Sequence, residues 1–142
     1  MLIPISNHLQ IRLPAAKARY GGALVEFAVC LPVLMILLLG SMEATSAIFV
    51  KQSLATSAYE GIREAAKTGA NSADAVASAE RVLAARGIRG ATVQLSPAEV
   101  YGVPRGSNVA IEVSASYAVN SPFFGHVLSD RTTKVRTVMS KE

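Results

Sequence analysis

The 142-residue chain is long enough for one domain with an appended segment, and about half of it is hydrophobic although it contains no Trp. Its formal net charge is +4, and residues 1–21 supply three cations and no acid. The remainder is nearly neutral, which argues against nucleic-acid binding because that function needs a concentrated basic face. The single cysteine, Cys30, excludes an intrachain disulfide and a cysteine metal cluster. We interpret it as a small buried hydrophobe rather than an intermolecular crosslink.

An apolar run over residues 23–42 is the most distinctive feature of the sequence. At about 1.5 Å per residue it spans roughly 30 Å, the thickness of one bilayer core. The preceding segment carries Lys17 and Arg19 and is predicted to be an extended leader on the cytoplasmic side, by the positive-inside rule. Pro32 lies within the run and can kink a helix, which membrane spans tolerate. The run therefore predicts a single membrane span with its amino end inside.

The helical pattern continues beyond the span, because apolar residues recur at three- and four-residue spacing from Ala44 to Lys67. We expect an apolar stripe that includes Ile48, Leu54, Ala55, Ala58 and Ile62, and a polar side that includes Lys51, Ser53, Thr56, Glu60 and Glu64. Glu60–Arg63 and Glu64–Lys67 are spaced to form ion pairs across one turn. The Thr-Gly-Ala-Asn sequence at 68–71 predicts the end of this helix.

A second helix and then strands are predicted for the rest of the chain. Asn71 or Ser72 caps the helix, and Gly87 is a plausible stop for it. Residues alternate between apolar and polar over 91–95, 109–119 and 133–139, which predicts about three antiparallel strands in a meander that needs a helix across its apolar face. The expected fold class is α+β: a long N-terminal membrane-spanning helix that continues as an amphipathic helix, a second short helix, and about three antiparallel strands. The expected divisions are 1–21, 22–68 and 69–142.

Motifs for catalysis or metal binding are missing from the sequence: it has no H-E-x-x-H, no phosphate-binding glycine loop and no paired cysteines. His8 lies in the leader, and we interpret His126 as a surface or satisfied histidine rather than a ligand or general base. The spacing of Ser, Asp and His does not suggest a triad. The sequence therefore predicts a non-enzymatic protein with no metal, no cofactor and no small-molecule substrate.

Gly21 and Gly22 stand just before the apolar run, and Glu26 lies one turn inside it. A charge deep in a membrane helix costs roughly 2.5–3.5 kcal/mol on insertion scales, so Glu26 is a functional candidate. Glycines favour a protease site because they lack side chains and resist helix formation. Cleavage after Gly21 would give Gly22 a cationic amine four residues from Glu26, and that amine could neutralise the carboxylate. The alternative is that Glu26 merely extends to the membrane surface.

The sequence around these residues resembles the TadE-like family of pseudopilins, from tight-adherence (Flp-type) type IV pili. The resemblance covers about residues 19–66 and rests on these stretches: Gly21-Gly22-Ala23-Leu24-Val25-Glu26-Phe27-Ala28, Leu31-Pro32 with the Leu-rich run after it, Gln52-Ser53-Leu54, Glu60-Gly61 with Arg63, and Ala65-Ala66. Within them, Phe27 and Pro32 are the helix positions that we single out beside the cleavage and assembly residues.

This resemblance implies a prepilin-type precursor with a pilin-like fold. A membrane prepilin peptidase would cut between Gly21 and Gly22, with the basic leader, including Lys17 and Arg19, as the recognition element. Glu26 would then serve assembly as the fifth mature residue. The implied protein is a minor pilin or pseudopilin of the bacterial inner membrane, with a periplasmic domain. Its implied partners are other pilins and the pilus assembly platform.

The sequence is also compatible with two other interpretations. One is a secreted protein cut by ordinary signal peptidase after residues 44–46 or after Ala47, although the apolar run is longer than the usual 7–15 residues of such signals. The other is a membrane-anchored envelope binding module that is never processed. The N-terminus of the mature protein distinguishes all three.

Overall fold

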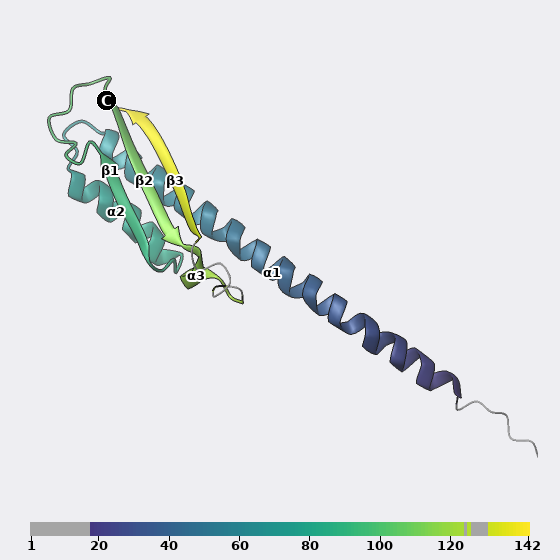
Figure 1. The fold of residues 1–142 in the computed structure, drawn as a ribbon. Helices are drawn as coiled ribbons and strands as arrows, with labels where there is room; N and C mark the ends of the chain where they lie inside the picture. The colour runs from purple at the N-terminus through teal and green to yellow at the C-terminus, as the bar shows by residue number, and fades with distance from the viewer. Residues whose placement is uncertain (1–17, 124, 126–130) are drawn as a thin grey trace, which may run out of the picture. The chain divides into compact units, whose positions relative to one another are not determined.

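The computed structural model describes residues 18–123, 125 and 131–142 (Figure 1). The predictions for Lys17 and the rest of the leader up to residue 17, and for His126, therefore lie outside the described residues. The chain forms two compact units, one ending at Leu37 and the other comprising Leu38–Glu142. This division falls inside the first helix, and the domain boundaries expected from the sequence remain predictions.

Helix α1 runs from Ala18 to Ala66 and passes through Pro32 without interruption. Its apolar side chains from Leu24 to Leu38 are exposed, as expected for a surface that faces lipid. Among the described residues, α1 is the helix that is long and apolar enough to cross a membrane. The sequence prediction of one continuous helix through the apolar run and beyond it is confirmed.

The part of α1 within the second unit carries the predicted apolar stripe. Leu54, Ala58 and Ile62 of this stripe are 0 % exposed and belong to the core. Val50, which was not predicted to be part of the stripe, joins them at 2 % exposed. Three predicted positions on this helix are wrong: Ile48 and Ala55 of the expected stripe are exposed, whereas Ser53 is buried on what was expected to be the polar side. Ser53 can be buried because its hydroxyl donates to the carbonyl of Phe49, 2.8 Å away, which satisfies the polar group within the helix.

Helix α2 runs from Ser72 to Ala85 and begins as the sequence predicts. The side chain of Asn71 accepts from the backbone N–H of Ala73 at 3.0 Å, so Asn71 is the N-cap. Gly87, with φ of +68°, adopts the left-handed conformation that ends many helices. The buried residues of α2 are Ala75, Ala79 and Leu83.

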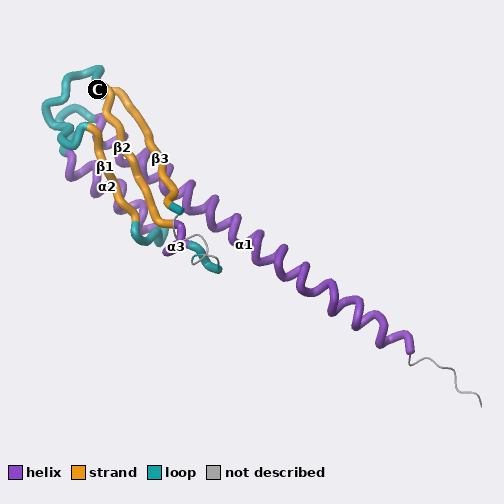
Figure 2. The backbone as a smooth tube through the Cα atoms, viewed as in Figure 1, coloured by secondary structure: helices purple, strands orange, loops and turns teal. Residues whose placement is uncertain are grey.

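The sheet contains three antiparallel strands in the order β1-β2-β3: β1 is Ala91–Ser96, β2 is Asn108–Ser116 and β3 is Thr132–Ser140. Ala115 pairs with Ala91 on one side and with Thr133 on the other, which fixes the register. The buried side chains of β2, including Ile111 and Val113, join the core formed by α1 and α2. Figure 2 shows the sheet lying over the helices, which supply the cover that the meander needs.

Close packing of α1 against its neighbours depends on Gly61. A Cβ at this position would lie 2.6 Å from Cδ1 of Ile111 and 3.0 Å from Cβ of Ala79. Both distances are too short for ordinary contact, so glycine lets α1 approach α2 and β2 closely.

The order of helices and strands and the packing of the sheet on the helices confirm the predicted α+β fold class.

The second strand ends earlier than the alternating pattern predicts. Tyr117 and Val119 were expected in the strand, but Tyr117–Asn120 forms a short helix, α3. Asn120 turns the chain by donating from its side-chain amide to the carbonyl of Ser116 at 2.9 Å. Ser121 then donates its backbone N–H to the carbonyl of Tyr117, also at 2.9 Å. These local bonds replace the ladder bonds that a longer strand would make.

Candidate functional site

The glycine pair that we predicted to be cleaved lies in the first turns of α1. A Cβ added at Gly21 or Gly22 would meet no heavy atom within 4 Å, and neither residue has a positive φ. Neither packing nor backbone conformation therefore requires glycine at these positions, in contrast to Gly61. Each costs a helix roughly 1 kcal/mol relative to Ala, so their presence needs a reason other than the described fold.

Glu26 lies one helical turn after Gly22 on the same face of α1, because residues four apart are neighbours on a helix surface. Its side chain is exposed, and among the described side chains none forms an ion pair with it. Phe27, the next residue, is 57 % exposed. Arg19 belongs to α1 as well, but its side chain is outside the described ones. The carboxylate is thus presented on an open helix surface close to the glycine pair.

Cys30 is exposed on α1, so its predicted role as a buried hydrophobe within the protein is wrong. The segment that surrounds it is apolar and exposed on all sides. The thiol therefore faces whatever surrounds the apolar helix rather than a protein core.

A second carboxylate, Glu43, marks the other end of the apolar run and lies within the second unit. It is only 7 % exposed and accepts several hydrogen bonds. The hydroxyl of Tyr117 donates to Oε1 at 2.7 Å, the hydroxyl of Ser121 donates to the same oxygen, and the backbone N–H of Phe123 donates to Oε2 at 3.3 Å. A carboxylate held by several donors fixes the geometry of the segment that supplies them. Glu43 therefore holds α3 and the residues after it against α1.

The contact with Glu43 alters the pKa of Tyr117. Burial of the phenol, its hydrogen bond to Glu43 and the negative charge of Glu43 together raise the pKa of Tyr117 to about 12. Nearby, the hydroxyl of Ser46 donates to the carbonyl of Asn120 at 3.2 Å. The backbone N–H of Arg89 donates to Oδ1 of Asn120 at 3.0 Å, and the side-chain amide of Asn120 donates to the Arg89 carbonyl at 2.9 Å. We use the term α3 lobe for residues 117–123, which these bonds join to α1 and to the loop after α2.

The sequence did not predict this carboxylate site. Glu43 was visible as the first charged residue after the apolar run, but its donors lie 74–80 residues further along the chain. Tyr117 is 8 % exposed, and no residue near it in the sequence indicates its partner.

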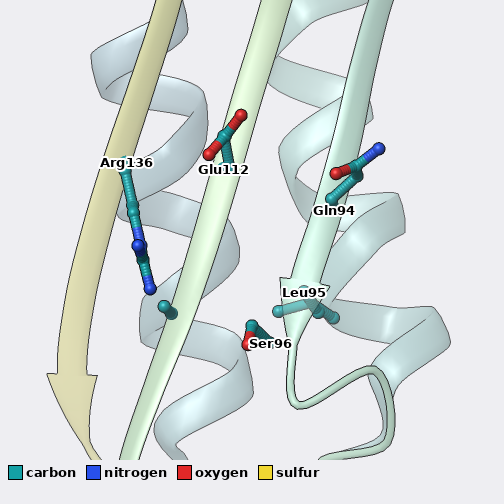
Figure 3. A pocket seen from close by; sticks show the side chains of 6 residues that line it. Gln94, Leu95, Ser96, Glu112 and Arg136 are labelled. Carbon is teal, nitrogen blue, oxygen red and sulfur yellow. The ribbon is translucent and has the colours of Figure 1, made fainter.

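The outer face of the sheet contains a shallow hollow of about 240 Å³. Gln94, Glu112 and Arg136 stand in one row across the three strands, and Glu112 also pairs with Lys134 at 3.5 Å. Figure 3 shows Glu112 and Arg136 extending in opposite directions along the sheet. The hollow is open and polar, unlike the mostly apolar, enclosed sites that hold small ligands. The described residues contain no group of three His, Cys, Asp or Glu side chains placed to hold a metal ion.

Comparison with protein families connects the N-terminal features to known proteins. A family model described as TadE-like protein matches residues 21–63. Over that range the chain is similar to TadE-like proteins. Searches of curated proteins and of solved structures found no match.

The match confirms the resemblance inferred from the sequence. It begins at Gly21, includes Glu26 and Glu43, and ends before the last turn of α1. The sheet and the α3 lobe lie outside the match. The match therefore bears on the apolar helix and the glycine pair, whereas the donors to Glu43 lie outside the matched segment.

Proposed function

We propose that the protein is a minor pilin or pseudopilin of a tight-adherence type IV pilus, with roles in adhesion, surface attachment and biofilm formation. Prepilin peptidase cuts the chain between Gly21 and Gly22, and the mature protein begins at Gly22. The observation that carries the proposal is the TadE-like match, which starts at this glycine pair and includes Glu26. The protein is a structural component rather than an enzyme.

The cleavage step uses the conformational freedom of the glycine pair. A peptidase needs an extended chain in its active site, whereas Gly21 and Gly22 are helical in the described structure. Two glycines lower the cost of unwinding this turn by about 1 kcal/mol each relative to Ala. No neighbouring atom within 4 Å of an added Cβ holds either residue in place. The leader cations Lys17 and Arg19 supply the recognition element next to the cut.

After cleavage, the new amine of Gly22 is cationic at neutral pH and lies one turn from Glu26. Pairing within one helix, or between helices staggered along a filament, removes the cost of an isolated carboxylate in lipid, which is roughly 2.5–3.5 kcal/mol. Glu26 thereby distinguishes processed from unprocessed subunits during assembly. Its exposure on α1 leaves it available to either partner.

The protein is anchored in the membrane by α1, with the basic leader in the cytoplasm and the sheet domain in the periplasm. Assembly brings it into contact with other pilins and the pilus assembly platform. A secreted form cut after residues 44–46 or Ala47 would lose Glu43, and with it the acceptor for Tyr117 and Ser121. This observation weighs against the signal-peptidase alternative.

The decisive experiment determines the N-terminus of the mature protein by mass spectrometry, in cells with and without the prepilin peptidase. We expect Gly22 as the first residue with the peptidase and an uncut leader without it. Gly21→Leu should block cleavage because its side chain enters the protease site. Gly40→Leu is a matched control, since Gly40 also has no atom within 4 Å of an added Cβ. A start near residues 45–48 would favour secretion, and a start at Met1 with the peptidase present would favour an unprocessed anchor.

A further inference from the structure

We infer that the α3 lobe is a membrane contact: it lies in the head-group layer of the bilayer next to α1, with Val119 and Phe123 facing lipid. This inference rests on the membrane anchorage in the proposed function, but not on cleavage or pilus assembly.

The level of the lobe relative to the bilayer follows from its bonds to α1. The apolar run ends at Met42, and Glu43 is the first charged residue after it. The head-group region adds about 5–8 Å on each side of the hydrocarbon core, which corresponds to roughly four or five residues of helix. Residues 43–47 of α1 therefore pass through this layer. Glu43 and Ser46 are the α1 residues whose side chains bond to the lobe, so the lobe lies at the same level.

The exposed surface of the lobe has the composition that this layer favours. Val119 is 47 % exposed and Phe123 is 48 % exposed, and both are large apolar side chains without cover in the described structure. Leu38 and Met42 are similarly exposed on the adjoining part of α1, which continues the apolar surface towards the span. Segments that lie in the membrane interface bury apolar side chains such as Phe and Leu at the boundary between head groups and acyl chains.

A cation flanks the apolar residues of the lobe. Arg89 is exposed, and its backbone bonds to the side chain of Asn120 in both directions, at 3.0 Å and 2.9 Å. A guanidinium at the level of the head groups can bind lipid phosphate through paired hydrogen bonds. The buried acid of this region, Glu43, is already engaged with the lobe and does not face the lipid.

The hydrogen bonds between the α3 lobe and Glu43 distinguish this surface from an apolar patch that is exposed by chance. Glu43 joins three donors of the lobe to the helix that crosses the membrane, and two of its bonds involve side chains. The arrangement fixes the position of Phe123 next to Glu43 on α1. A loop that only covered the end of the sheet would not have to bond to Glu43, the first residue after the apolar run.

Because the chain has no Trp, single Trp substitutions are specific fluorescent reporters. The full chain is reconstituted into phosphatidylcholine vesicles that contain a brominated phosphatidylcholine, which quenches Trp within the bilayer. Phe123→Trp tests the lobe and Phe27→Trp reports the span. Tyr101→Trp is the negative control, because Tyr101 is 73 % exposed and precedes the start of β2, whereas the lobe follows the end of that strand.

We expect quenching of at least about twofold for Phe123→Trp and Phe27→Trp, with a shallower bromine position more effective for residue 123, and little quenching for Tyr101→Trp. Quenching at 27 without quenching at 123 would overturn the inference while leaving the membrane anchor intact. Loss of quenching at both positions would overturn the anchor and the inference together. Emission at 123 that shifts only in assembled pili would identify the lobe as a protein contact instead and would also overturn the inference.

The contribution of Arg89 is tested by adding phosphatidylglycerol, which increases the density of anionic head groups. Quenching at residue 123 should increase with this lipid, and Arg89→Gln in the Phe123→Trp background should abolish the increase. Equal quenching in both lipid mixtures would overturn the phosphate contact. Circular dichroism of each variant establishes that the fold is retained.

Discussion

Replacing Tyr117 by Phe tests how strongly Glu43 holds the α3 lobe. The change removes a hydroxyl that lies 2.7 Å from Oε1 of Glu43 and 3.3 Å from its backbone carbonyl, and it leaves the ring in place. A hydrogen bond to a charged group contributes about 1.5–3 kcal/mol. Glu43 keeps its bonds from Ser121 and Phe123, so we expect a loss at the lower end, about 1.5 kcal/mol in the free energy of unfolding at neutral pH.

The pH dependence gives a sharper test than the loss at one pH. The pKa of Tyr117 is about 12 in the folded protein, against an ordinary value of 10.0. Because the folded pKa is the higher one, the protonated phenol stabilises the fold fully below pH 10, and this stabilisation is lost as the pH rises from 10 towards 12. A shift of two units corresponds to an upper bound of about 2.7 kcal/mol. The repulsion between ionised Tyr117 and the carboxylate of Glu43 is one of the causes of this shift and is included in that bound.

The assay is urea unfolding of the full chain in mild detergent, followed by circular dichroism between pH 8 and pH 11.5. Other groups titrate in this range, so the informative quantity is the difference in unfolding free energy between wild type and Tyr117→Phe. That difference should fall as the pH rises above 10. Tyr101→Phe makes the same chemical change at a 73 % exposed position and should alter stability by less than about 0.5 kcal/mol at any pH. Parallel pH curves for wild type and Tyr117→Phe would refute the reasoning.

Two further predictions concern α1. Gly61→Ala should destabilise the domain by about 1–2 kcal/mol, because its Cβ would lie 2.6 Å from a buried side chain of β2 and overpacking outweighs the better helix propensity of Ala. The same urea assay checks this, with Gly40→Ala as a control that should be neutral or slightly stabilising; equal effects of the two changes would contradict the packing argument. Glu26→Gln should leave membrane insertion and cleavage intact but reduce the amount of protein in sheared pili, because it removes the charge that pairs with the new amine. Normal incorporation of this variant would rule out the charge-pairing model.

Much of the fold was predictable because local signals and the final structure agree. Asn71 precedes a run with helical periodicity and caps α2, and Gly87 follows that run and ends it. The ion pair between Glu60 and Arg63 forms at 3.1 Å, as its spacing predicts. These features depend on residues close together in sequence, so their physical causes are visible without the fold.

The α3 lobe could not be predicted because its causes lie far apart in sequence. Alternation through Tyr117 and Val119 fits a strand, and nothing nearby indicates that Tyr117 binds a carboxylate 74 residues earlier. Ser57 illustrates the same limit: its buried hydroxyl donates to the carbonyl of Ala79 at 2.9 Å, a partner on another helix. In each case the partner of a buried polar group lies on a distant part of the chain, so the local sequence pattern cannot indicate it.

Glu26 and Glu43 lie near opposite ends of the apolar run, and the charge of each carboxylate is stabilised in a different way. An acid near the hydrocarbon region needs donors or a cation, since water cannot satisfy it there. Glu43 receives donors from its own chain, from Tyr117, Ser121 and Phe123, so its requirement is met once the domain folds. Among the described side chains Glu26 has no ion-pair partner, and the amine that could serve it is created only by cleavage before Gly22. The two carboxylates therefore have different roles. Loss of Glu43 should destabilise the folded domain, whereas loss of Glu26 should affect only the assembly step that follows cleavage.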